Sequence, residues 1–308
     1  MKTCAYIIAL FFLTSCELVV NIDVPYGKDK IVLNTVQMVD SVWTVELTRS
    51  NYVLSPIQGT FFPINQAIVT ITNPDGSTEQ LSDQGKGVYK GASRPERGKT
   101  YHVSASAISL DGVEGQMTMP TVVKMIDVKW DSSNVREDSN PYIYIDLPFE
   151  VTFNDPPGEK NFYAIELYEI RYQGVYNSDG MPVTDPETGE QVFDSVAYQI
   201  DAFIKDLAIA SNDDLRHQFS DETFDGKTYN APMTIQVFVG PPNSPDKRQY
   251  RLRLVSMSED YFKYLETKNL AQEIRGDPFA QPMPVFSNMN NGFGIFGGIA
   301  VDTWRYER

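Results

Sequence analysis

Short runs in which apolar and polar residues alternate recur along most of this chain. In residues 43–48, for example, a Trp, a Val and a Leu fall on one side of an extended backbone and polar residues fall on the other. Because successive side chains of a strand point to opposite faces, this two-residue period indicates half-buried β-strands. The segment 73–76, Asn-Pro-Asp-Gly, is a strong turn signal after another such run. The pattern therefore predicts a mainly β fold.

Strands and turns follow one another closely enough to predict two β-sandwich domains. Strands roughly 8–12 residues apart with turns between them are typical of sandwiches, and 308 residues fit two domains of roughly 100–200 residues each. We expect the first sandwich over residues 31–120 and a larger second β domain over residues 121–308, with a polar loop at 131–140 near their junction. The predicted strands are 31–37, 43–48, 67–72, 87–89, 100–105, 122–130, 142–147, 162–172, 192–204, 231–239, 249–257 and 295–304.

One segment near the C-terminus departs from the strand pattern and predicts a single helix near residues 258–274. Ser256 and Glu259 match a capping box, in which the Ser is the N-cap and the Glu follows three residues later. Large apolar residues then occur among charged ones, and Gly276 offers a stop. We expect a helix of about 15 residues that packs on a sheet.

The N-terminus has the pattern of a bacterial lipoprotein signal. Lys2 supplies a positive charge, and the apolar run 5–13 follows it. This run is too short to span a bilayer core, which needs about 20 residues, and it suits a secretory signal peptide. The next residues, 13–16, read Leu-Thr-Ser-Cys and look like a lipobox. The alternative is a buried N-terminal strand with an accidental Cys.

The lipobox predicts how the chain is processed and anchored. Cleavage between Ser15 and Cys16 would remove a signal peptide, residues 1–15, and the thiol of Cys16 would be acylated. Residues 16–30 would then form a tether. No other stretch of the sequence approaches 18 apolar residues, so we expect a protein that is anchored to a membrane by lipid and does not span it.

The charge of the chain excludes two classes of partner. Its 41 acidic and 26 basic residues give a formal charge of −15. Nucleic acids and anionic lipid surfaces are bound through Lys and Arg, so this balance argues against both. Two Cys and two His residues are too few for a Cys-rich zinc site or a disulfide framework. The acids are best interpreted as a solvated surface, and no cofactor is expected.

The motifs of common enzymes are missing from the sequence. It contains no Gly-x-Ser-x-Gly nucleophile elbow, no His-Glu-x-x-His zinc motif and no complete Gly-x-x-x-x-Gly-Lys-Ser/Thr phosphate loop. His102 lies in an alternating run, which is typical of a surface strand residue, and His217 lies in a polar segment. Paired carboxylates could support glycoside hydrolysis, but abundant acids form such pairs on any solvated surface. We therefore predict a protein that is not an enzyme and has no catalytic residues.

Two acidic segments are weak candidates for a calcium site. The first lies between the predicted strands 162–172 and 192–204, which we expect to form a long hairpin. Oxygen ligands ahead of a Gly are typical of part of a calcium loop, but EF-hand spacing is not met, and the same residues serve turn geometry. The candidate ligands of the first segment are Asn177, Asp179, Asp185 and Glu187, with Glu190 nearby, and those of the second are Asp221, Glu222 and Asp225.

A glycine-rich segment, 290–298, precedes the last predicted strand. It could form a backbone nest for an anion. No Lys, Ser or Thr follows in the place that such a nest needs. Asn-Gly turns that lead into a closing strand, 295–304, with glycines that allow tight packing, explain the segment better.

Motifs spread along the whole mature chain resemble one family. The most specific is 284–297, Pro-Val-Phe-Ser-Asn-Met-Asn-Asn-Gly-Phe-Gly-Ile-Phe-Gly, and 219–226, Phe-Ser-Asp-Glu-Thr-Phe-Asp-Gly, is similar to a recurrent family segment. Weaker matches lie at 16–17, 21–25, 31–34, 67–71, 87–89 and 98–101. In their order these motifs resemble the Bacteroidota lipoproteins grouped as DUF4249, a domain of unknown function.

The resemblance implies a fold and a context, but no catalytic residues. It implies that the first domain is an immunoglobulin-like sandwich of the prealbumin-like or carboxypeptidase-regulatory-like kind. Relatives accompany TonB-dependent outer-membrane transporters of the starch-utilisation type. Surface-export signals in this phylum usually place a run of acids after the lipidated Cys. Here Glu17 is followed by Leu-Val-Val, so both the surface-exposed and the periplasm-facing leaflet stay open.

These observations favour one function over two alternatives. We expect a lipid-anchored outer-membrane protein that is a non-enzymatic binding or accessory subunit of a TonB-dependent transporter, for nutrient capture or as a lid. A structural or adhesive surface lipoprotein is the first alternative. A hydrolase with paired carboxylates is the second, and it would require a cleft with two carboxyl groups roughly 5–10 Å apart, at least one of them buried.

Overall fold

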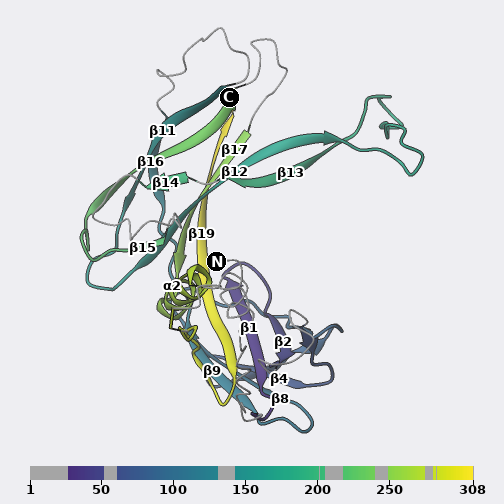
Figure 1. Ribbon diagram of the computed structural model, residues 1–308, viewed down its shortest axis with the longest axis vertical. Helices are drawn as coiled ribbons and strands as arrows, with labels where there is room; N and C mark the ends of the chain where they lie inside the picture. Colours follow the sequence, from purple (N-terminus) through teal and green to yellow (C-terminus); the bar gives the residue numbers. More distant parts are fainter. Residues whose placement is uncertain are drawn as a thin grey trace, which may run out of the picture.

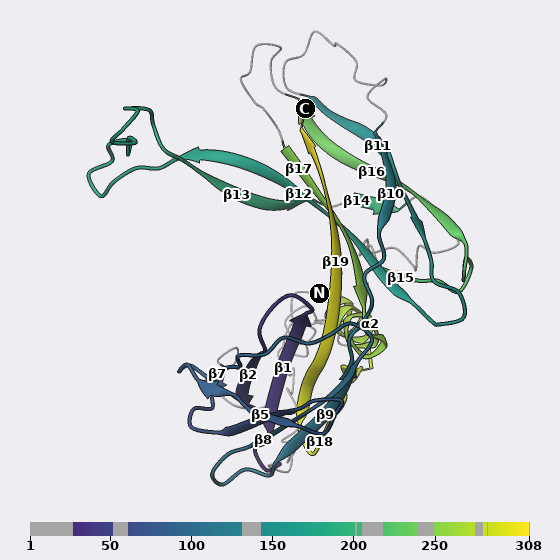
Figure 2. The ribbon, with the colours of Figure 1, turned by 180° about the vertical axis from the view of Figure 1, so that it is seen from behind.

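The computed structural model describes residues 27–51, 61–130, 143–200, 202–204, 218–239, 249–274, 280–281 and 283–307. The predicted signal peptide, Gly276 and the junction loop 131–140 lie outside these residues. The described part is mainly β, as predicted, and its sheets form two sandwich-like lobes that share one long strand (Figures 1 and 2). Among the described helices, none is long and apolar enough to cross a membrane.

The largest sheet runs through both lobes. Its strands, in spatial order, are β13 (Phe193–Ile200), β12 (Phe162–Gly174), β17 (Gln249–Met257), β19 (Phe293–Glu307), β1 (Ile31–Met38), β2 (Thr44–Arg49), β7 (Val88–Lys90) and β6 (Ser82–Asp83). Two short strands lie off this path, β15 (Gln218–Ser220) beside β12 and β3 (Phe62–Pro63) beside β2.

Strand β19 connects the lobes by changing partners along its length. Its first half pairs in parallel with β1, from Phe293 opposite Val32. Its second half pairs antiparallel with β17, and Ile299 takes part in both ladders, opposite Met38 and opposite Met257. The yellow ribbon of β19 therefore runs from the bottom of one lobe to the top of the other (Figure 1).

The first lobe closes around an aromatic core with residues from both ends of the chain. Its second sheet consists of β18 (Met289–Asn290), β9 (Val113–Thr118), β8 (Thr100–Ser106), β4 (Ile68–Thr72) and β5 (Thr78–Gln80). Trp43 is fully buried, and its ring centroid lies 5.0 Å from that of Tyr101 and 5.9 Å from that of Phe296. Met289 and Phe296 belong to this core. The predicted range 31–120 leaves both out, because the pairing of β1 with β19 builds the C-terminal segment into the first sandwich.

The second lobe packs a four-stranded sheet against the strands β12 and β17. The sheet consists of β10 (Met125–Trp130), β11 (Ile143–Asn154), β16 (Thr228–Val239) and β14 (Ala202–Ile204). Phe153 is at the centre of its core and lies 5.0–6.4 Å, between ring centroids, from four other rings. These are the rings of Tyr163, Phe219, Phe224 and Tyr229. Buried aromatic pairs of this kind add about 0.5–1.5 kcal/mol each beyond their burial.

The predicted helix is α2 (Glu259–Glu273), and it begins two residues later than a capping box would place it. Ser258 is the N-cap, while Ser256 still belongs to β17. The capping-box assignment was therefore wrong, because the strand continues through Ser256. Phe262 packs its ring 4.6 Å from that of Phe162, so the helix lies on the sheet as expected.

The glycine-rich segment is part of the closing strand. Gly294 has φ +108°, and a Cβ there would collide with the carbonyl oxygen of Leu33 on the neighbouring strand. At Gly298, a Cβ would lie 2.7 Å from the sulfur of Met117 and 2.8 Å from that of Met119. These glycines let β19 approach β1 and the first core, as expected from the sequence.

Candidate functional site

Several predicted site residues lie outside the described part of the chain. These are Ser15, Cys16 and His217. His102 is described, and it is exposed on the outer face of β8, opposite Gln116 of β9. The structure thus places one of the two His residues on a solvated sheet face.

The first calcium candidates lie at the tip of the hairpin formed by β12 and β13. Asn177 Oδ1 accepts hydrogen bonds from the backbone N–H groups of Asp179 (3.0 Å) and Met181 (2.9 Å). Asp185 Oδ1 accepts two more, from Glu187 (2.7 Å) and Thr188 (3.1 Å), and these bonds lower the pKa of Asp185. Such hydrogen bonds are typical of Asx turns. The side-chain oxygens of Asn177 and Asp185 therefore shape the hairpin tip.

The second acidic segment contributes to a carboxylate cluster in the second lobe. Oxygens of Asp155, Asp221 and Asp225 all lie within 4.8 Å of one another, and the first two residues are buried. Glu222 forms an ion pair with Lys160 at 3.0 Å instead. The cluster joins the turn after β11 to the turn after β15, because the ladder between β11 and β16 sets Asn154 opposite Thr228.

Each carboxylate of this cluster accepts hydrogen bonds from the protein itself. Asp155 accepts from the hydroxyl of Tyr163 (2.5 Å) and from the N–H of Gly226 (2.9 Å). Burial raises the pKa of Asp155, and these two hydrogen bonds offset part of the rise. Burial and the nearby Asp155 also raise the pKa of Tyr163.

The other two acids are bonded in the same way. Asp221 accepts from the backbone N–H of Asn161 at 2.8 Å, and Asp225 accepts from that of Gly158 at 2.9 Å. The cluster thus fastens two turns to one another.

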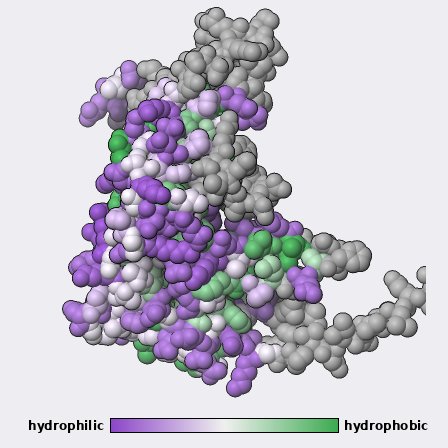
Figure 3. Space-filling model, turned by 90° about the vertical axis from the view of Figure 1, so that its left-hand side faces the viewer, coloured by the Kyte–Doolittle hydropathy of each residue, from purple (hydrophilic) through white to green (hydrophobic). Residues whose placement is uncertain are grey.

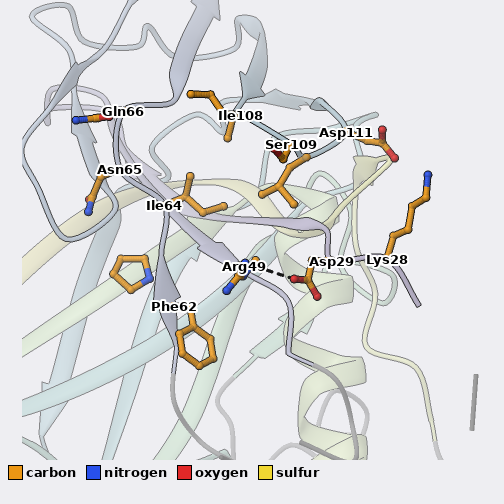
Figure 4. Close-up of a pocket in the computed structure, with 13 residues that line it drawn as sticks. Lys28, Asp29, Arg49, Phe62, Ile64, Asn65, Gln66, Ile108, Ser109 and Asp111 are labelled. Carbon is orange, nitrogen blue, oxygen red and sulfur yellow. Dashed lines mark ion pairs between the residues drawn. The ribbon is translucent and has the colours of Figure 1, made fainter. Parts of the chain in front are cut away.

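A groove in the first lobe is large enough to hold a small ligand (Figure 4). Its volume is about 800 Å³, within the range of about 300–1,000 Å³ that is usual for small-molecule sites. It is formed by the start of the described chain, the end of β2, the segment around β3 and the loop between β8 and β9. The lining residues are Lys28, Asp29, Arg49, Phe62, Pro63, Ile64, Asn65, Gln66, Ala107, Ile108, Ser109, Leu110 and Asp111.

The lining of the groove combines charge with exposed apolar surface. Arg49 pairs with Asp29 at 3.5 Å, and its guanidinium lies 5.7 Å from the centroid of the Phe62 ring. Ile108, on the β8–β9 loop, is 88% exposed. An Arg held between a carboxylate and an aromatic face can bind a polar group of a ligand, while Phe62 and Ile108 offer contact to an apolar part.

Two residues of the groove have a backbone conformation that non-glycine residues rarely adopt. Gln66 has φ +58° and Ser109 has φ +66°. Positive φ stores strain, and such residues are concentrated at functional sites. The N–H of Gln66 donates to Asp83 at 2.7 Å, which holds this residue in place.

Comparison with known proteins assigns the chain to a family. A family model described as a domain of unknown function, DUF4249, matches residues 18–305. The chain belongs to this family. The match reaches from the predicted tether to the last strand, so both DUF4249 lobes and the hairpin between β12 and β13 fall within it. No curated protein matches the chain. The family resemblance is thereby confirmed, while the lipid anchor and the association with a transporter stay predictions.

Two features of this DUF4249 chain were missed by sequence reasoning. The groove is assembled from four segments that lie far apart in the sequence, around residues 28–29, 49, 62–66 and 107–111. The third acid of the cluster, Asp155, lies in the turn Asn-Asp-Pro-Pro-Gly at 154–158. Nothing local in that turn indicates that it meets Asp221 and Asp225.

Proposed function

We propose that this DUF4249 chain is a lipid-anchored cell-envelope protein that serves as a non-enzymatic binding or accessory subunit of a TonB-dependent outer-membrane transporter. Its role would be to capture a nutrient for the transporter or to act as its lid. The observation that carries the proposal is the position of the groove. Lys28 and Asp29 line it, and they follow the predicted lipidation site, Cys16, by about a dozen residues.

The length of the tether limits how far the groove can lie from the membrane. Twelve residues span at most about 40 Å when fully extended. A ligand in the groove would therefore be held close to the outer membrane, where a barrel could receive it. The mixed lining, which includes Arg49, Phe62 and Ile108, suits a small amphipathic ligand.

The chemistry of the described residues supports a binding role over a hydrolytic one. The carboxylates that lie close together, in the cluster around Asp155, accept hydrogen bonds from backbone N–H groups and from Tyr163. A catalytic acid pair needs oxygens that can reach a substrate. Figure 3 shows the face of the molecule that lies on the left-hand side of Figure 1. Its side chains are mostly hydrophilic, with small hydrophobic patches, as suits a solvated envelope protein.

The proposal is tested by isolating the protein with its neighbours in the native cell. The chromosomal copy is given a C-terminal affinity tag, complexes are cross-linked in living cells, and the tagged protein is purified from outer membranes. We expect one TonB-dependent barrel to be recovered in an amount nearly equal to that of the tagged protein. We also expect a strain that lacks the gene for this protein to lose growth on one nutrient. A tagged outer-membrane lipoprotein of another family is the control. Recovery of no barrel after cross-linking would overturn the proposal.

A groove variant then tests the role of the groove in capture. Arg49→Glu combined with Ile108→Asp changes its charge and its apolar surface. We expect this variant to retain the barrel but to reduce uptake of the nutrient. Ile126→Asp, on β10 and 58% exposed, is the matched control outside the groove. Unchanged uptake in the groove variant would exclude the groove as the capture site.

A further inference from the structure

The hairpin of β12 and β13 extends away from the second lobe as a two-stranded arm (Figures 1 and 2). We define the arm as residues 172–198. Among the described strands, none pairs with the outer edge of β13. Most residues of the arm are exposed on both faces of the ribbon. A free strand edge invites pairing with another chain.

One face of the arm carries three exposed aromatic rings. Tyr172, Tyr176 and Phe193 are 51%, 61% and 58% exposed. The register sets Phe193 opposite Gly174 and Ser195 opposite Tyr172, so the three rings share a face. Gly174 has no side chain. The ring of Tyr176 lies 3.3 Å from the point that a Cβ of residue 174 would occupy. We call Tyr172, Tyr176 and Phe193 the aromatic face.

The charge of the arm is of one sign. Residues 172–198 contain five carboxylates and no Lys or Arg. At the base of the arm, Arg171 is held by Glu169 at 2.5 Å, and its guanidinium lies 4.8 Å from the centroid of the Tyr198 ring. Cationic groups on a partner would complement the arm, whereas like charges in an interface are strongly unfavourable.

The arm is built to hold its shape before it meets a partner. Isolated bridges continue the ladder beyond the strands, between Tyr176 and Pro182 and between Thr184 and Gln191. The Asx turns at Asn177 and Asp185 close the tip. A preorganised element loses little conformational entropy on binding, and Tyr is among the residues enriched at binding hot spots.

We propose that the arm docks on a second protein, whose surface offers an apolar cleft rimmed by Lys and Arg that receives the aromatic face. This inference rests on the proposed function, in which that second protein is the transporter barrel. The acids of the arm steer the encounter, and the three rings provide the contact area that is removed from water.

Two sets of substitutions separate the rings from the charges. The aromatic variant combines Tyr172→Ser, Tyr176→Ser and Phe193→Ser. The acid variant combines the three substitutions Asp179→Asn, Glu187→Gln and Glu190→Gln. The matched control combines Ile68→Ser and Ile126→Ser, at side chains that are 57% and 58% exposed away from the arm. Circular dichroism and the thermal midpoint show that each variant is folded.

The experiment measures binding of the full mature chain to the purified barrel in detergent. We expect the aromatic variant to raise the Kd by more than about 30-fold, as for loss of an interface hot spot, and the control to leave it unchanged. The acid variant should bind more slowly and with a weaker dependence on salt.

Three results would overturn the inference. A folded aromatic variant that binds the barrel as tightly as the wild type would exclude the arm as the docking element and leave the proposed function standing. A wild type that does not bind the barrel would overturn both proposals. Self-association of the wild type, abolished in the aromatic variant, would identify a second copy of this chain as the occupant.

Discussion

Ser258 and Gly298 exchange two hydrogen bonds where helix α2 begins beside strand β19. The N–H of Ser258 donates to the carbonyl oxygen of Gly298 at 2.9 Å, and the N–H of Gly298 donates to Ser258 Oγ at 3.1 Å. Both residues are buried. This pair fastens the start of the helix to the strand that the two lobes share.

Replacement of Ser258 by Ala is expected to destabilise the chain. It leaves the buried N–H of Gly298 without its side-chain acceptor, which costs about 1–3 kcal/mol. The free energy of unfolding, measured by urea titration, checks this. Ser258→Thr keeps a hydroxyl and should restore part of the stability. Ser106→Ala, at an exposed position of β8, should stay within about 0.5 kcal/mol of the wild type, and an equal loss at both sites would contradict the assigned role.

Replacement of Gly294 by Ala tests the close approach of β19 to β1. An Ala there adopts a positive φ and brings its Cβ into the carbonyl oxygen of Leu33. Backbone strain alone costs about 1–3 kcal/mol, and the collision adds to it. Gly180→Ala is the matched control, because its φ is +76° with no atom within 4 Å of the added Cβ. We expect a clearly larger loss of unfolding free energy at Gly294, and equal losses would show that the collision is relieved without cost.

Replacement of Tyr163 by Phe is expected to destabilise the second lobe more at neutral pH than in acid. Asp155 has a raised pKa in the fold, so the native state binds more protons than the unfolded chain, and stability falls as pH rises above about 3.9. The hydrogen bond from the hydroxyl of Tyr163 lowers the pKa of Asp155 and so offsets part of its rise. Removal of the hydroxyl raises the pKa of Asp155 further, so that stability continues to fall up to a higher pH.

Urea titrations over a pH series measure this effect. We expect a loss of about 1.5–3 kcal/mol at neutral pH, as for a hydrogen bond to a charged group, and a smaller loss near pH 4. Tyr172→Phe, at an exposed residue that bonds Gln249, should change little. A loss that does not depend on pH would show that Asp155 is not the group that Tyr163 serves.

The local parts of the fold could be predicted from the sequence. Strands such as β8 and the hairpin of β12 and β13 follow from alternation and nearby turn residues, because the side chains that decide them are close in sequence. Strand β9 was missed, since Gly115 interrupts the alternation of apolar residues in Val113–Thr118. The start of the helix was misplaced because Ser256 fits a cap locally, whereas the ladder of β17 with β19 continues through Ser256, which lies opposite Ala300.

The long-range parts could not be predicted, because the residues that decide them are far apart in the sequence. The parallel pairing of Val32 with Phe293 joins opposite ends of the chain, and no local pattern specifies it. The acidic turn with Asp221 and Asp225 was noticed as a candidate site, but Asp155 reaches it only through the register of β11 and β16. The arm was expected as a hairpin, yet its projection away from the lobe depends on where the neighbouring strands end.

The turn residues at the tip of the arm lead us to expect no stabilisation by calcium. Asn177 and Asp185 use their oxygens for backbone N–H groups. A site with a Kd of about 10 µM would add about 2.7 kcal/mol in about 1 mM calcium, which raises the thermal midpoint of a chain of this size by several degrees. We expect the midpoint to be the same in calcium and in a chelator. A rise that Asp185→Asn abolishes would restore the calcium site.

The lipid anchor gives the most direct prediction from the sequence. Cys16→Ser removes the thiol that the lipobox presents for acylation, so cells that are fed labelled palmitate should yield an unlabelled protein. Cys4→Ser is the matched control, because Cys4 lies within the predicted signal peptide and its loss should leave the label in place. The membrane fraction should follow the label, since a chain without the acyl group keeps no stable anchor. A labelled Cys16→Ser protein, or a Cys4→Ser protein without label, would contradict the anchor at Cys16 and remove the argument that places the groove near the membrane.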